Sequence, residues 1–272
     1  MRHRHSGYTI VEVMIVLGIS GVLLLSALAL FSGQSKETGF DQGTHDAASE
    51  ILTKVKEVGS SLLPNATEFT CTLDAGRPVL DTGGSPDNQG SNGQCVVLGK
   101  AFEAASSDNT IYIYTVLGKR AASSGEIVTK LSDAGAEPVI NGVGNNVDLT
   151  EKYQLPNGVK IISSQVRLAS SGTFDARSLV GYYTNLQGDA TSGQNGSQLL
   201  TIKGYNYNST NGYIESMIKD CIEQVGLCAT PPADIDVWRL CLSDPDGLKS
   251  AVLDVASSSS GLTTSLKFIS CS

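Results

Sequence analysis

Glu12 is a lone carboxylate inside an apolar run, and a carboxylate there needs a partner. Residues 8–31 number 24 and are otherwise apolar or small. As a helix they would extend about 36 Å, against a hydrocarbon core of about 30 Å in a bilayer. A carboxylate near the centre of such a segment costs up to roughly 2.5–3.5 kcal/mol, and buried charges of this kind usually have a partner. We therefore expect Glu12 to meet a positive charge.

The charges that flank the apolar run give its orientation. Arg2 and Arg4 precede it, and no positive charge follows before Lys36. The positive-inside rule places the N-terminus in the cytoplasm and the rest of the chain outside. A plain signal anchor or a removable signal peptide, cut near Ala27-Leu28-Ala29, would also fit this pattern. Both alternatives leave Glu12 unexplained.

The first residues resemble a known processing signal. The leader MRHRHSG (1–7) is followed by YTIVE and an unbroken apolar run. This arrangement is similar to the prepilin N-terminus of type IV pilins and type II secretion pseudopilins. The resemblance implies a cut after Gly7 by a prepilin peptidase, N-methylation of the new first residue Tyr8, and a role for Glu12, the fifth mature residue, in assembly.

The match has two departures and covers roughly residues 1–30. Members of the family usually begin the mature chain with Phe, whereas this chain has Tyr8. Many pilins carry a helix-breaking proline about twenty residues into the mature chain, where this sequence has Ala29. Local melting of the helix is therefore less assured here.

Cleavage would give Glu12 its partner. Removal of the leader leaves a charged amine on Tyr8, which is expensive to bury alone. Four residues along a helix span about 6 Å. Glu12 of one subunit can therefore meet the Tyr8 amine of a neighbour that is shifted along the bundle, and each charge neutralises the other. We expect this pair to set the axial register of an assembly.

The six cysteines indicate disulfides. They lie at Cys71, Cys95, Cys221, Cys228, Cys241 and Cys271. None forms a CxxC pair and no histidine accompanies them at ligand spacing, which argues against zinc. An even number of cysteines beyond an export segment is typical of disulfides formed outside the cytosol. Of fifteen possible pairings, chain order favours Cys71–Cys95, Cys221–Cys228 and Cys241–Cys271, with free buried thiols as the alternative.

The elements that must position these groups are one long helix and a β-rich head. We expect the helix over 8–63, spanning the membrane over 8–31 and interrupted near Gly33, Gly39 and Gly43. Its second half should be amphipathic, since apolar residues recur every three to four positions; they are Ala48, Ile51, Leu52, Val55, Val58 and Leu62. Leu63-Pro64-Asn65 should end it.

The remaining residues, 64–272, predict a disulfide-stapled head of short strands. Segments rich in β-branched and aromatic residues alternate with Gly, Ser, Asn and Asp clusters. The expected strands are 68–73, 94–102, 110–118, 159–169, 179–186, 198–207, 236–242, 249–256 and 264–271, with a helix at 212–228. The fold class is therefore α+β, a long helix packed on an antiparallel sheet. The layout loosely resembles H-type minor pseudopilins and FimT/FimU-like minor pilins.

Composition and side-chain inventory argue against other chemistries. The net charge is −8 and no basic patch follows residue 4, so we expect no nucleic-acid partner. His45 is the one histidine beyond the leader and is interpreted as a surface residue. Asp244 and Asp246 lie in SDPDG, a turn signal, with calcium binding as the less favoured alternative. We expect no catalytic set and no cofactor.

Three function classes follow. The favoured one is a structural subunit, held in the inner membrane with its head outside and then assembled into a type IV pilus or a secretion pseudopilus, as a minor subunit. Its partners would be the prepilin peptidase, other pilin subunits, the assembly platform of the inner membrane and the membrane itself. The alternatives are an adhesive or DNA-uptake minor pilin, which would use loops 81–94 and 187–197, and an anchored or secreted enzyme.

Overall fold

The computed structural model describes residues 9–60, 69–82, 95–119, 128, 131, 133–141, 147–184, 200–207, 215–228, 231–258 and 261–271. The chain divides into two compact units, residues 1–42 and 43–272.

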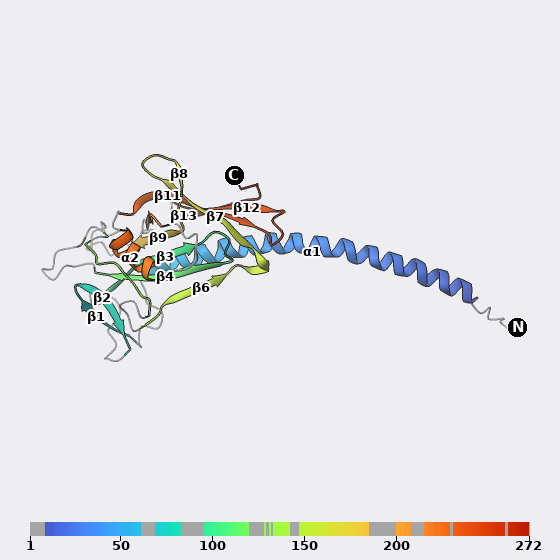
Figure 1. The fold of residues 1–272 in the computed structure, drawn as a ribbon, viewed down its shortest axis with the longest axis horizontal. Coiled ribbons are helices and arrows are strands. Elements are labelled where there is room, and N and C mark those ends of the chain that lie inside the picture. The colour runs from blue at the N-terminus through green and yellow to red at the C-terminus, as the bar shows by residue number, and fades with distance from the viewer. Residues whose placement is uncertain are drawn as a thin grey trace. The chain divides into compact units, whose positions relative to one another are not determined.

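The first unit is the N-terminal part of helix α1 (Ile10–Ser60) (Figure 1). Its segment Ile10–Leu28 is long and apolar enough to cross a membrane, and none of it is buried. The expected interruptions at Gly33, Gly39 and Gly43 are wrong, because α1 stays helical through all three positions. An isolated glycine costs a helix only about 1 kcal/mol relative to alanine, which the flanking turns can offset.

Gly43, the first residue of the second unit, allows a close approach of the helix to the head. A Cβ at this position would lie 2.9 Å from Val159 Cγ2 and 3.0 Å from the carbonyl oxygen of Pro156. Pro156 begins the short 3-10 helix η1 (Pro156–Gly158). The glycine is therefore a packing residue at the point where the chain enters the head, and a side chain would force the two elements apart.

From Gly43 onward α1 buries one face. The expected apolar positions Ile51, Val55 and Val58 are fully buried, as is Ala47, whereas its neighbour Ala48 is only half-buried. The three-to-four residue spacing is that of an amphipathic helix whose apolar stripe faces a core. The second half of the helix is thus a structural part of the head, as the sequence predicts.

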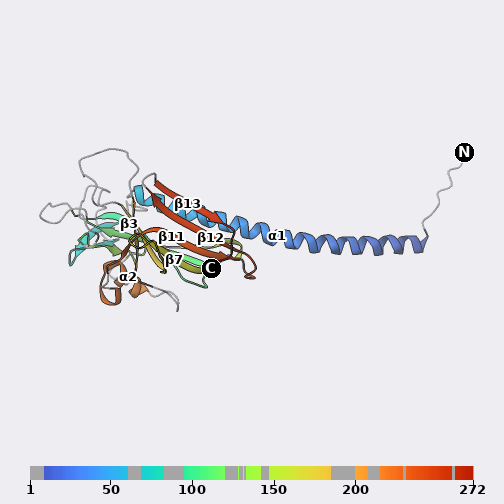
Figure 2. The same ribbon diagram turned by 90° about the horizontal axis from the view of Figure 1, so that it is seen from above.

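The head is built from antiparallel strands in two groups (Figures 1 and 2). One group has the order β10-β9-β3-β4, with β5 and β6 paired to β4. Its strands are β3 (Val96–Ala104), β4 (Thr110–Gly118), β5 (Glu137–Pro138), β6 (Thr150–Gln154), β9 (Leu179–Thr184) and β10 (Leu200–Gly204). In the other group β11 lies between β12 and β7, with β13 and β8 outside them. These strands are β7 (Lys160–Leu168), β8 (Phe174–Ala176), β11 (Ala233–Ser243), β12 (Ser250–Ser258) and β13 (Gly261–Lys267).

The two groups are joined at one place and share a core. β10 pairs with β11 only through Lys203↔Asp234 and Gly204↔Ala233. Between the groups, the buried ring of Phe102 lies 5.5 Å from that of Tyr182 and 5.6 Å from that of Trp238. A separate hairpin, β1 (Thr70–Asp74) and β2 (Arg77–Asp81), completes the strands that the structure describes. The predicted α+β fold, a helix with a large antiparallel sheet, is confirmed.

Two predicted boundaries differ from the structure for physical reasons. The helix expected over 212–228 is α2 (Glu215–Glu223) followed by the 3-10 helix η2 (Gly226–Cys228). Gln224 has φ 58°, a left-handed conformation that ends an α-helix. The strand expected over 264–271 stops at Lys267, because Cys271 is bonded to Cys241 on β11. That bond carries the chain across the end of β12 instead of alongside it.

The six cysteines form three disulfides in the structure. The pairs are Cys71–Cys95, Cys221–Cys228 and Cys241–Cys271, with Cα–Cα separations of 6.2, 4.6 and 5.9 Å. The first ties the β1–β2 hairpin to the residue before β3, and the second closes α2 onto η2. The third fixes the C-terminal segment to β11.

Loss of the first disulfide should weaken the head measurably. Cys71 and Cys95 are 24 residues apart, and in the chain-entropy treatment a loop of this size contributes about 3.5 kcal/mol. We expect Cys71→Ser/Cys95→Ser to lower the free energy of unfolding by up to this amount. The fluorescence of Trp238, the only tryptophan, would report the transition. Non-reducing peptide maps of the unmodified chain that contain free thiols, or a Cys71–Cys241 peptide, would contradict the pairing.

Candidate assembly site

Thr9 and Glu12 form the start of α1. Thr9 lies just before the first helical residue, and its Oγ1 accepts the backbone N–H of Glu12 at 3.2 Å. Its carbonyl oxygen accepts the N–H of Val13, also at 3.2 Å. This is the Thr-x-x-Glu spacing of a capping box, in which the side chain of the cap residue accepts the third amide of the helix. The sequence analysis missed this signal, which is visible as TIVE.

The cap explains where the helix begins but gives the Glu12 carboxylate no counter-charge. A carboxylate in the first turn gains typically 0.3–1 kcal/mol from the helix dipole, which is small beside the cost of a charge within an apolar bundle. Glu12 is exposed in the isolated chain, and the next cation along the helix is Lys36, 24 residues away. Gly7 and Tyr8 lie outside the described residues, so their roles stay predictions.

The second half of α1 is held on the head by four alternating charges. The ammonium of Lys100, a buried residue of β3, lies 2.6 Å from Glu57 Oε2 on α1 and 2.6 Å from Glu151 Oε1 on β6. Lys54 on α1 lies 2.6 Å from Glu151 Oε2. Burial by itself raises the pKa of Glu151, but hydrogen bonds from Lys100 and Lys54 outweigh it and hold that pKa below its usual value. These contacts fix the rotation of the helix against the sheet, so movement of residues 43–60 carries the head with it.

A comparison with protein families identifies the N-terminal segment. The family described as "Prokaryotic N-terminal methylation motif" matches residues 2–28. This segment is a prepilin-type N-terminus, the kind found in type IV pilin-like proteins. The matched range contains the Gly7–Tyr8 step, Thr9, Glu12 and the apolar helix up to Leu28. The motif implies processing by a prepilin peptidase and assembly with other pilins, and it points to a structural protein rather than an enzyme.

The head of this chain is not covered by that match. No curated protein and no solved structure matches the chain. Apart from Asp81 and Thr82, the loops 81–94 and 187–197 that an adhesive subunit would use lie outside the described residues.

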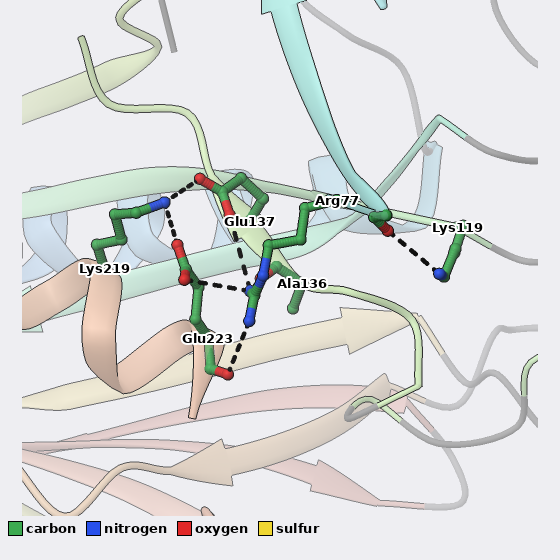
Figure 3. Close-up of polar contacts among 7 residues, drawn as sticks. Arg77, Lys119, Ala136, Glu137, Lys219 and Glu223 are labelled. Carbon is green, nitrogen blue, oxygen red and sulfur yellow. Dashed lines mark hydrogen bonds and ion pairs between the residues drawn. The ribbon is translucent and has the colours of Figure 1, made fainter. Parts of the chain in front are cut away.

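The second charged cluster of the head joins three elements (Figure 3). Glu137 on β5 and Glu223 at the end of α2 are held between Arg77 on β2 and Lys219 on α2. Arg77 Nη1 lies 3.7 Å from Glu137 Oε2 and 3.4 Å from Glu223 Oε2, and Lys219 forms ion pairs with both carboxylates. Arg77 also donates to the carbonyl oxygen of Ala136 at 3.0 Å. Each basic side chain contacts both carboxyl groups, so the cluster fastens the β1–β2 hairpin and α2 to the sheet.

This cluster should make the stability of the head depend on pH. Burial first, and then the neighbouring Glu223 carboxyl, raise the pKa of Glu137 to about 7 against the opposing effect of Lys219. The unfolded value is about 4.3, so the folded head binds this proton more tightly than the unfolded chain does. The stability that this proton provides is present below about pH 4.3 and is lost as the pH rises to about 7.

We expect the midpoint of thermal unfolding, followed by Trp238 fluorescence on the full chain in detergent, to fall between about pH 5 and pH 7.5. Glu137→Gln should flatten this dependence, while Asp74→Asn, which changes an exposed carboxylate on β1, should keep it. A midpoint that rises with pH in the unmodified chain through this range would contradict the assignment.

Other side chains with chemical potential have structural settings. His45 is exposed, and its ring lies 6.1 Å from that of Phe268. Asp244 Oδ1 accepts the N–H groups of Leu248 at 2.7 Å and Lys249 at 3.1 Å, which confirms the predicted turn. Within the part of the chain that the structure describes, no group of three or more His, Cys, Asp or Glu is placed to hold a metal ion.

Proposed function

We propose that this chain is a structural subunit of a type IV pilus or type II secretion pseudopilus. In this proposal a prepilin peptidase cuts after Gly7, Tyr8 is N-methylated, and the mature chain waits in the inner membrane with its head outside. An assembly platform of the inner membrane then adds the chain to a filament, in which α1 makes the contacts with the other subunits. The large, triply disulfide-bonded head favours a minor subunit.

One observation carries this proposal. The methylation motif coincides with an apolar helix none of whose residues is buried in the isolated chain and that contains a single charge, Glu12. A helix of this kind must be covered by lipid or by other apolar helices. A buried charge in a helix bundle requires a partner, and lipid tails supply none. The pairing of Glu12 with a neighbour's Tyr8 amine would supply that partner.

Immunogold electron microscopy of surface or periplasmic filaments tests the proposal. Antibodies against the head should label filaments from cells that contain the gene and should fail to label those from a deletion strain. Filaments that never carry the label, with the protein found only in the membrane or free in the medium, would refute a structural role. Protein found only in the membrane or free in the medium would favour the anchored or secreted enzyme.

A further inference from the structure

Three large apolar side chains are exposed together at one end of the head. Leu248, Phe268 and Ile269 are 84%, 48% and 52% exposed, and are called the base patch below. Leu248 lies in the turn between β11 and β12, and the other two follow β13. Ser250 Oγ donates to the carbonyl oxygen of Ile269 at 3.1 Å, so the two segments lie side by side.

Both segments of the base patch are fixed in place. The two backbone hydrogen bonds to Asp244 hold the turn that carries Leu248. The disulfide between Cys271 and Cys241 holds the chain just after Ile269. Singly scattered apolar residues are normal on a protein surface, whereas grouped ones mark contact sites. A group that is already ordered loses little conformational entropy on binding.

The base patch lies where the chain enters the head. The ring of Phe268 contacts that of His45, with 6.1 Å between centroids, and the head unit begins at Gly43. A partner that packs along the side of α1 that carries His45 and reaches this level therefore meets the patch.

Lipid is the less suitable cover for the base patch. Residues 32–42, which number 11, separate the apolar run that ends at Phe31 from the head. They are helical, so this path is about 16 Å long. The headgroup layer on each side of a bilayer is only about 5–8 Å thick.

A neighbouring helix suits the patch better. Packed helices have axes 8–10 Å apart, so a neighbour that packs on the His45 side of α1 lies within side-chain reach of Phe268. If its Tyr8 amine meets Glu12, the neighbour is shifted by four residues, about 6 Å. Its residue 39 then lies level with Gly43, just before its own head begins.

We propose that the base patch docks the helix of a neighbouring pilin-like subunit. The contact lies over the residues of that helix that correspond to residues 29–42 of this chain. This inference rests on the proposed function. It names a contact between the head and a neighbouring helix, in addition to the contacts between helices. Helix-to-helix pairing through Glu12 would set the register, and the base patch would seat each head against the bundle.

Photo-crosslinking in assembled filaments tests the contact directly. We expect a benzoylphenylalanine at position 248 of the full chain to give adducts that mass spectrometry maps to residues 29–42 of a pilin-like subunit. The same probe at position 73, where Leu73 is 39% exposed on β1, should give no adduct with that segment. Adducts of position 248 with lipid or with another head surface would overturn the proposal. So would an absence of adducts from filaments that contain the subunit.

A charged variant separates this inference from the proposed function. Because Leu248 is 84% exposed, Leu248→Glu should leave the thermal midpoint of the head unchanged. It should lower incorporation into filaments about tenfold, the effect expected when one apolar side chain is no longer buried. Leu248→Met should incorporate normally. Normal incorporation of Leu248→Glu would refute the base patch alone, whereas failure of the unmodified chain to enter any filament would refute the proposed function.

Discussion

Glu12→Val is expected to remove this subunit from filaments while leaving its export, cleavage and head folding intact. Valine is more apolar than glutamate and therefore eases residence in the membrane. The head, residues 43–272, does not include the first turn of α1, which contains Glu12. In the bundle, however, the Tyr8 amine of a neighbour would confront no carboxylate. Breaking a buried pair costs about 3–5 kcal/mol, and this cost recurs at every subunit contact. Immunoblots of sheared filaments and of membranes would measure the partition.

Glu12→Gln is the informative companion variant. The N–H of residue 12 that donates to Thr9 Oγ1 belongs to the backbone, so glutamine keeps the helix cap and removes only the charge. Loss of assembly in both variants assigns the effect to the carboxylate. Thr9→Ser, which keeps the capping oxygen, should assemble normally. Filaments of normal number and length that carry Glu12→Val along their sides would show that the charge is not needed. A subunit that occupies only the tip has no neighbour ahead of it and would be exempt.

Gly7→Leu is expected to leave the uncut precursor in the membrane. The match to the methylation motif includes this position, and the family resemblance implies that the peptidase cuts after a glycine. Without the cut Tyr8 has no free amine, so Glu12 of the neighbour loses its partner and assembly should fail as well. Immunoblots that resolve the precursor from the mature chain would show the block.

Ala27→Leu is the matched control for this variant. It destroys the Ala27-Leu28-Ala29 site that a conventional signal peptidase would use and leaves the prepilin site untouched. We expect normal processing of this control. A precursor that accumulates in Ala27→Leu and not in Gly7→Leu would reverse the assignment in favour of a signal peptide.

The sequence predicted the elements whose local signals are strong. Strand β4 was expected over 110–118 and has those bounds, because TIYIYTVLG is almost continuously β-branched or aromatic. The buried face of α1 was found from its periodicity. The three disulfide pairs follow chain order because each joins neighbouring elements.

What the sequence did not reveal depends on partners that are far apart in the chain. β6, TEKYQ, is polar, because it pairs with β4 on one side and carries Glu151 to Lys54 and Lys100. β5 has only two residues, and β2 contains a proline, which argues against a strand. Arg77 and Glu223 are 146 residues apart in the chain, so no local pattern announces their cluster. Thr9 is different, since its capping spacing was readable and was passed over.

The mature N-terminus, determined by intact mass and terminal sequencing of the protein from membranes or filaments, tests the central claim most directly. The account predicts a chain that begins at Tyr8, carries one added methyl group on its amine and retains all three disulfides. A chain that begins at Leu30 would identify a cleaved signal peptide, and one that still begins at Met1 would identify a plain anchor. Either result would remove the Tyr8 amine that Glu12 is proposed to meet.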